Sequence, residues 1–152
     1  MLRWRMFLTF LAIVLSIMGG VHWYLFVRLV AETQIPAPWS GWVGGALVVV
    51  VLCIPLSFIA SRALDKNLAR FFVVPIYVWL GFAFQTFFLL LAIDLVRALG
   101  WIGGSLFQES FWFSDPGQAL LAWRVVGGAV VGITLLATVF AIWWCLSKLV
   151  VK

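Results

Sequence analysis

Four long stretches without charged residues most constrain what this chain can fold into. None of them contains Arg, Lys, Asp or Glu, and they span Met6–Val27, Thr33–Ser61, Phe71–Ile93 and Val125–Ser147. A helix rises 1.5 Å per residue, so about 20 residues cross a bilayer core of roughly 30 Å. A helix also bonds its backbone groups internally, as lipid requires. The sequence therefore predicts an all-α integral membrane protein, a bundle of four transmembrane helices.

Prolines and charges set the expected bounds of these helices. Pro36 and Pro38 cannot continue a regular helix, so the second span begins after them. Arg3 and Arg5 precede the first span as in a signal peptide, but the apolar run is too long and no A-x-A-like site closes it. We predict one membrane domain covering residues 1–152, with helices at about 6–30, 41–61, 71–98 and 118–148.

The segment between the third and fourth predicted helices, residues 99–114, is rich in aromatic residues. Gly103 and Gly104 interrupt it, so we do not expect a fifth span. Its aromatic side chains predict an interfacial or re-entrant segment at the outer face of the membrane, and an ordinary loop is the alternative. Asp115 and Pro116 then provide a capping residue and a first helical residue for the fourth helix.

Charged residues are too few to cover a surface that faces water. They make up 10% of the chain, against 66% hydrophobic residues, whereas a soluble domain is about 25% charged. This excludes a soluble enzyme and a nucleic-acid-binding protein, although the net charge is +5. The lipid bilayer is the expected partner, and a membrane or peripheral protein is a second one. No metal or cofactor is expected.

The distribution of Lys and Arg predicts the orientation of the helices. Seven fall on one side of the predicted membrane: Arg3, Arg5, Arg62, Lys66, Arg70, Lys148 and Lys152. Three fall on the other side: Arg28, Arg97 and Arg124. Because positive residues are enriched in cytoplasmic loops, both termini are expected in the cytoplasm.

Four ionisable residues within or near the spans form the candidate site. A charge inside a span costs about 2.5–3.5 kcal/mol on insertion scales, so each needs a partner or a purpose. The residues are His22, Asp94, Arg97 and Arg124, and the helix lengths place His22, Asp94 and Arg124 at similar depth in the outer leaflet. One interpretation is a polar pocket that opens to the outside. The other is an ion pair, between Asp94 and either arginine, that locks the bundle.

Small residues indicate where helices approach each other closely. Lipid tails are as apolar as leucine, so helices in a bilayer associate where small side chains let their backbones meet. The candidate packing residues are Gly19, Gly20, Gly41, Gly45, Gly128 and Gly132. Packing inside one bundle is the first interpretation, and association of two copies is the alternative.

Three sequence runs resemble a known family. They are His22–Val30, before a loop that contains proline, then Tyr77–Phe84, and then Asp94–Arg97. Together they resemble the N-terminal transmembrane domain of bacterial membrane-bound metallophosphoesterases, in which such a bundle precedes a calcineurin-like catalytic domain. The Asp-x-His, Gly-Asp-x-x-Asp and Gly-Asn-His patterns of that catalytic domain do not occur here. The resemblance implies no catalytic residue in this chain.

These observations leave several functional hypotheses. The first is a non-enzymatic anchor or scaffold in a bacterial inner (cytoplasmic) membrane. If the chain is part of a longer protein, the resemblance implies a metallophosphoesterase. The alternatives are a membrane module that binds a small molecule, a lipid or an ion, and an accessory subunit of a transporter or other membrane complex.

Overall fold

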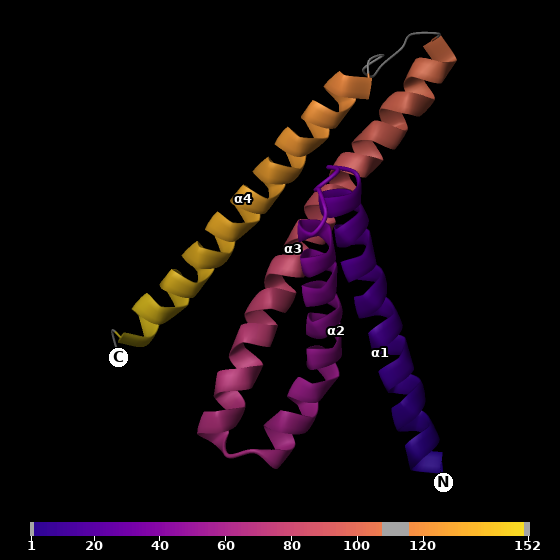
Figure 1. Cartoon of the computed structure of the whole chain (residues 1–152). Helices are drawn as coiled ribbons and strands as arrows, with labels where there is room; N and C mark the ends of the chain where they lie inside the picture. The colour runs from indigo at the N-terminus through magenta and orange to yellow at the C-terminus, as the bar shows by residue number, and fades with distance from the viewer. Residues whose placement is uncertain (1, 108–115, 151–152) are drawn as a thin grey trace. The chain divides into compact units, whose positions relative to one another are not determined.

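The computed structural model describes residues 2–107 and 116–150, and every regular element in those ranges is a helix (Figure 1). In chain order the elements are α1 (Leu2–Phe26), η1 (Val27–Ala31), α2 (Trp39–Ala63), α3 (Lys66–Phe107) and α4 (Pro116–Val150). Four stretches are long and apolar enough to cross a membrane: Trp4–Ala31, Trp39–Ala63, Asn67–Ile102 and Gly117–Ser147. The predicted helical class and the four long apolar helices are confirmed for the described residues.

Prolines mark the starts of two helices, α2 and α4, near their predicted positions. Pro38 is the residue before the first turn of α2, and Pro116 is the first residue of α4. A proline suits the start of a helix because the amide hydrogen that it lacks would have no partner there. Pro55 and Pro75 lie inside α2 and α3, and both helices continue past them.

The third helix extends beyond residue 98, the predicted end of the third transmembrane helix. The helix α3 continues to Phe107 and includes both Gly103 and Gly104. A glycine inside a helix costs only about 1 kcal/mol relative to alanine, so two glycines among apolar residues do not stop it. Residues 99–107 therefore extend α3, and residues 108–114 of the predicted interfacial segment lie outside the described residues. The position of this segment at a membrane surface stays a prediction.

The chain divides into two compact units, Met1–Ala83 and Phe84–Lys152. In the first unit α1 and α2 run antiparallel and pack together (Figure 1). The π-helical turn η1 extends α1, and there an Arg28 guanidinium nitrogen donates a 2.6 Å hydrogen bond to Glu32 Oε2. Gln34 then adopts the left-handed conformation, with φ of 52°, in the loop that leads to α2.

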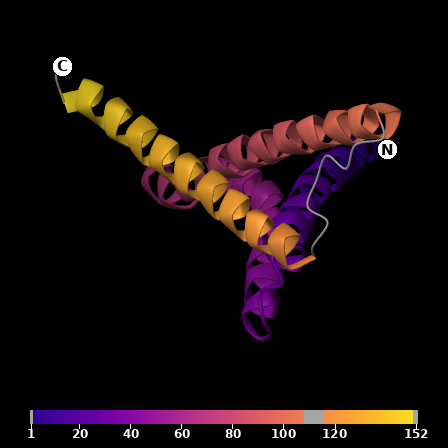
Figure 2. The same ribbon diagram turned by 90° about the horizontal axis from the view of Figure 1, so that it is seen from above.

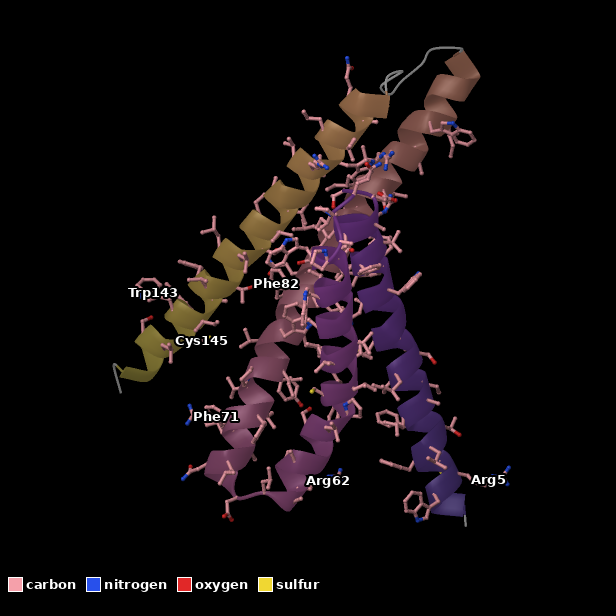
Figure 3. All side chains as sticks on the ribbon, viewed as in Figure 1. Arg5, Arg62, Phe71, Phe82, Trp143 and Cys145 are labelled. Atoms are coloured by element: carbon pink, nitrogen blue, oxygen red, sulfur yellow. The ribbon has the colours of Figure 1, made fainter. Side chains whose placement is uncertain are left out.

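Two arginines of the first unit, Arg5 and Arg62, lie at the same end of it. Arg5 lies near the start of α1, Arg62 near the end of α2, and Phe71 near the start of α3, and Figure 3 shows all three at the same end of this unit. Arg70 immediately precedes Phe71 in the sequence. Arg28 lies in η1, at the other end of α1. The antiparallel connection of the helices thus places the positive charges asymmetrically.

The second unit consists of the C-terminal part of α3 and all of α4. Each helix is continuous in both views (Figures 1 and 2). Thr86 on α3 and Thr134 on α4 are fully buried, and the hydroxyl of Thr86 donates a 3.2 Å hydrogen bond to that of Thr134. The Thr134 hydroxyl in turn donates to the carbonyl oxygen of Val130 at 2.9 Å. These hydroxyl contacts are polar links between two helices whose composition is otherwise mostly apolar.

Candidate functional site

His22 is a buried polar residue of α1, with 3% of its surface exposed. Its Nδ1 lies 2.8 Å from the carbonyl oxygen of Met18, one helical turn earlier. Its Nε2 lies 3.0 Å from Nε1 of Trp79 on α3, and the two rings are nearly parallel with centroids 6.4 Å apart. His22 therefore connects two helices that are far apart in the sequence.

These two contacts determine which ring nitrogen of His22 donates a hydrogen bond and which accepts one. The indole nitrogen of Trp79 can only donate a hydrogen bond, so Nε2 of His22 accepts it. The backbone oxygen of Met18 can only accept, so Nδ1 carries the proton and donates it. Both ring nitrogens are engaged by protein groups, and the ring is the neutral Nδ1–H tautomer. In this arrangement His22 is a connector between α1 and α3, and neither nitrogen is open to a ligand.

Asp94 and Arg97 lie on one face of α3 in the second unit. The Arg97 Nη1 atom is 3.9 Å from Asp94 Oδ1, which is an ion pair with a spacing of three residues. The guanidinium of Arg97 also lies over the ring of Trp123 on α4, 4.1 Å from its centroid. The Asp94 side chain is 18% exposed and that of Arg97 is 37% exposed. Sequence reasoning identified the acid and the arginine but missed the aromatic residue that holds the guanidinium.

His22 and Arg124 are the other predicted members of the cluster. Arg124 is exposed on α4, next to Trp123 in the sequence. Its pairing with Asp94 stays a prediction. His22 belongs to the first unit, whereas Asp94, Arg97 and Arg124 belong to the second. A single pocket that contains all four residues also stays a prediction.

A double-mutant cycle tests which arginine neutralises Asp94. We expect Asp94→Asn and Arg97→Gln to couple by less than about 1 kcal/mol, because exposed ion pairs contribute little to stability. We expect a larger coupling between Asp94→Asn and Arg124→Gln, since a carboxylate within a span needs a close cation. The measurement is the free energy of unfolding in mixed micelles. Additive losses for Asp94 and Arg124 would remove that pair and leave Arg97 as the partner.

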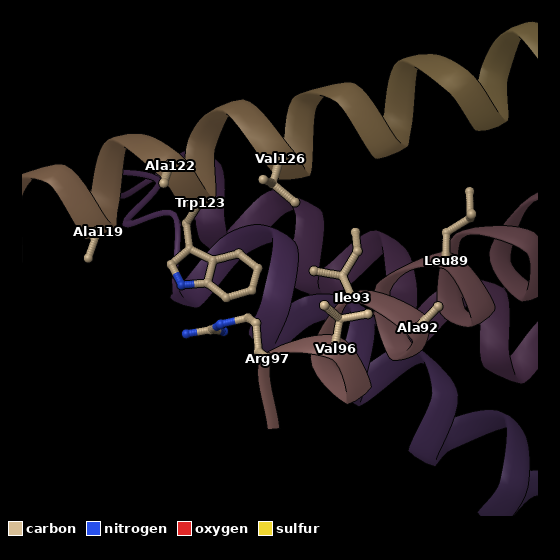
Figure 4. Close-up of a pocket in the computed structure, with 9 residues that line it drawn as sticks. All are labelled: Leu89, Ala92, Ile93, Val96, Arg97, Ala119, Ala122, Trp123 and Val126. Atoms are coloured by element: carbon tan, nitrogen blue, oxygen red, sulfur yellow. The ribbon is translucent and has the colours of Figure 1, made fainter. Parts of the chain in front are cut away.

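A cavity of about 450 Å³ lies between α3 and α4 in the second unit (Figure 4). Eight of its nine lining residues are apolar, and Arg97 is the charged one. Figure 4 shows the Arg97 guanidinium beside the Trp123 indole toward the end of the lining that Ala119 closes, and Leu89 at the other end. Apolar walls with a few polar groups are typical of ligand pockets, whose volumes are about 300–1,000 Å³.

A second cavity, of about 300 Å³, lies in the first unit between α1 and α2. His22, Phe26 and Gly44 are among its lining residues. A Cβ atom on Gly44 would lie 3.1 Å from Cε2 of Phe26, which is closer than an ordinary van der Waals contact. Gly44 is therefore the glycine at which α2 most closely meets a side chain of α1.

The glycines that the sequence selected for packing have open space beside them. A Cβ atom added to any of them would meet no heavy atom within 4 Å among the described residues: Gly19, Gly20, Gly41, Gly45, Gly128 and Gly132. Beyond their own helix and chain neighbours, these six positions have no close contact with the part of the chain that the structure describes. Their role in helix packing stays a prediction.

Three contact residues were not selected from the sequence as site residues: Trp79, Trp123 and Gly44. The indoles stand among ten tryptophans, and no local pattern distinguishes them from residues of an interfacial belt. The hydrogen-bonded pair of Thr86 and Thr134 had a weak signal in the sequence, because hydroxyl side chains are uncommon in otherwise apolar spans. Comparison of the chain with protein-family models, with curated proteins and with solved structures finds no match.

Proposed function

We propose that this chain is a four-span integral membrane domain that anchors or scaffolds a partner at the cytoplasmic face of a bacterial inner membrane. One observation carries the proposal: in each of the four apolar windows only 12–17% of the residues are buried in the protein. Large apolar side chains face outward on every helix; examples are Trp42, Phe71 and Leu136, which are 73%, 78% and 73% exposed. Soluble monomers rarely expose apolar patches above a few hundred Å².

The polar groups of the described residues support the same environment. Every buried side-chain nitrogen or oxygen among them has a hydrogen-bond partner. The hydroxyls of Ser57 and Thr138 donate hydrogen bonds to backbone carbonyl oxygens of their own helices. Lipid offers no hydrogen bonds, so a chain whose exterior is apolar and whose interior is fully bonded is suited to it.

The asymmetry of charge favours the cytoplasmic orientation of both termini. Arg5 and Arg62 lie at the same end of the first unit as Phe71, which follows Arg70 in the sequence, and Arg28 lies in η1 at the other end of α1. Cationic residues are retained on the cytoplasmic side during insertion. An N-in, C-in bundle presents its C-terminus to the compartment in which a cytoplasmic partner would be found.

The resemblance to metallophosphoesterase membrane domains supports the anchoring role through particular residues. Two of its three runs contain His22 and Trp79, which are hydrogen-bonded to each other at 3.0 Å. The third run contains Asp94 and Arg97, which form the ion pair on α3. Residues that carry the resemblance thus hold helices or helix faces together. In the proposed role this chain supplies the membrane attachment, and the chemistry belongs to the partner or to a catalytic domain.

The test combines attachment with topology. Green fluorescent protein fused after Lys152 should be fluorescent, because the predicted orientation places it in the cytoplasm. It should also stay with the membrane after carbonate extraction, because four spans hold it there. The same reporter without this chain is the control and should be soluble. Release of the fusion by carbonate would contradict the anchoring role.

Cysteine labelling in intact spheroplasts tests the orientation. In a Cys53→Ser, Cys145→Ser background, a membrane-impermeant maleimide should label Ala37→Cys and leave Asn67→Cys unlabelled until the cells are opened. Both positions are exposed in the structure, at opposite ends of α2. External labelling at residue 67 with none at residue 37 would reverse the assignment.

A further inference from the structure

The cavity between α3 and α4 combines an apolar channel with one cationic end. Leu89, Ile93 and Val96 on α3 line it together with Ala122 and Val126 on α4. Arg97 lies eight residues after Leu89 on the same helix, a distance of about 12 Å along the axis. The cavity is therefore elongated along the helices, and the charge lies at its end rather than in its middle.

The guanidinium of Arg97 has unused hydrogen-bonding capacity. Within the described residues it makes the 3.9 Å ion pair with Asp94 and the ring contact with Trp123, and it donates no hydrogen bond within 3.5 Å. An arginine carries five N–H donors, which lie along the edge of the planar group. The Trp123 ring covers the face of this plane. The edge that binds an oxyanion through paired hydrogen bonds thus remains available.

The lining of the cavity favours an anion at this end, because Arg97 is the one charged residue among the residues that line it. The Asp94 carboxylate is 3.9 Å from Arg97 Nη1 and does not line the cavity. The depth is also suitable, because Arg97 lies five residues, or about 7.5 Å, before Ile102 at the end of the candidate span. A residue near the end of a span reaches the headgroup region, while the rest of the cavity extends toward the bilayer centre.

From this geometry we propose that the cavity binds one anionic phospholipid, with its phosphate on the Arg97 guanidinium and an acyl chain along the apolar wall. The proposal rests on the membrane insertion proposed above. A zwitterionic lipid carries its own cation beside the phosphate, so it gains less from Arg97. A small soluble anion would leave the apolar channel unfilled, and the burial of apolar surface supplies much of the binding energy of such a site.

The experiment measures lipid binding to the detergent-purified full chain by native mass spectrometry. Dioleoyl phosphatidylglycerol and dioleoyl phosphatidylcholine are added in equal amounts, so that only the headgroup differs. We expect the first bound lipid to be phosphatidylglycerol by about tenfold, which corresponds to one charge-assisted hydrogen-bonding interaction. Arg97→Gln should lower this ratio to about one, and Arg97→Lys should retain part of it, since it keeps the charge without the planar fork.

Two further variants separate this site from general attraction to lipid. Arg70→Gln removes the same charge from the exposed N-terminal part of α3, and it should leave the ratio unchanged. Ala122→Phe places a ring in the cavity and should remove the retained lipid while Arg97 is still present. It also keeps the proposal testable if Arg97→Gln does not fold.

Three results would overturn the proposal. The first is an equal loss of the preference for phosphatidylglycerol in Arg70→Gln. The second is a ratio of phosphatidylglycerol to phosphatidylcholine near one in the wild type, and the third is a bound lipid that Ala122→Phe does not displace. A dimer that dissociates in Arg97→Gln would instead identify a second copy of the chain as the occupant. Failure of the membrane insertion itself is distinguishable, because it would appear as release by carbonate whatever the lipid preference.

Discussion

Gly44→Leu should lower the free energy of unfolding by about 1–3 kcal/mol, the usual cost of forcing additional carbon atoms into a packed contact. A Cβ atom at this position already lies 3.1 Å from the Phe26 ring, so the longer side chain must displace that ring or separate α1 from α2. The Phe26 ring is itself stacked on Trp23, with centroids 6.1 Å apart, which limits where it can go. Unfolding in mixed micelles, followed by proteolysis of the unfolded fraction, measures the loss.

The adjacent glycine is the matched control. Gly45→Leu makes the same chemical change one residue away, where a Cβ atom meets nothing within 4 Å in the described structure. Both substitutions gain the same helix propensity of roughly 1 kcal/mol, so that term cancels in the comparison. We expect Gly45→Leu to be at least as stable as the wild type. Equal destabilisation by the two variants would show that the contact with Phe26 does not limit packing.

This pair of glycines also explains why the packing surface was not predicted from the sequence. The spacing of Gly41 and Gly45 matches a common motif of interacting helices, yet the close contact is at Gly44. One residue along a helix is a rotation of about 100°, so an error of one position selects a different face. The motif gives a spacing, but the face that α2 turns toward α1 depends on the geometry of the whole segment between Phe26 and Trp39.

The helices themselves could be predicted because the length of an apolar run is a local property. Pro38 and Pro116 mark helix starts for reasons that involve only their own backbone. The end of α3 was missed because Gly103 and Gly104 were weighed as helix breakers, whereas a glycine inside a helix costs only about 1 kcal/mol relative to alanine.

The contacts of the candidate site differ in how far the sequence alone could predict them. Asp94 and Arg97 share a face through their spacing of three residues, which the sequence reveals. The pairing of His22 with Trp79 joins positions 57 residues apart. It requires the register between two helices, and the sequence contains no local signal for that register.

The pair of His22 and Trp79 leads to the second large effect. Trp79→Phe keeps an aromatic ring but removes the indole N–H, so Nε2 of the buried His22 loses its donor. His22→Phe leaves the Trp79 N–H without an acceptor. Leaving a buried polar group unsatisfied costs about 1–3 kcal/mol. We expect each single substitution to lower the free energy of unfolding by an amount in this range, with Trp79→Phe also losing packing area.

The double variant distinguishes the hydrogen bond from simple loss of packing. Replacing both residues by Phe removes donor and acceptor together, so no polar group is left unsatisfied, and the combined loss should be smaller than the sum of the single losses. Trp42→Phe, which changes an indole on α2 that is 73% exposed, should be nearly neutral and serves as the control. Strictly additive losses in the double variant would mean that the two side chains act independently. In that case His22 would not connect α1 to α3, and its burial would have to be explained by its bond to Met18 alone.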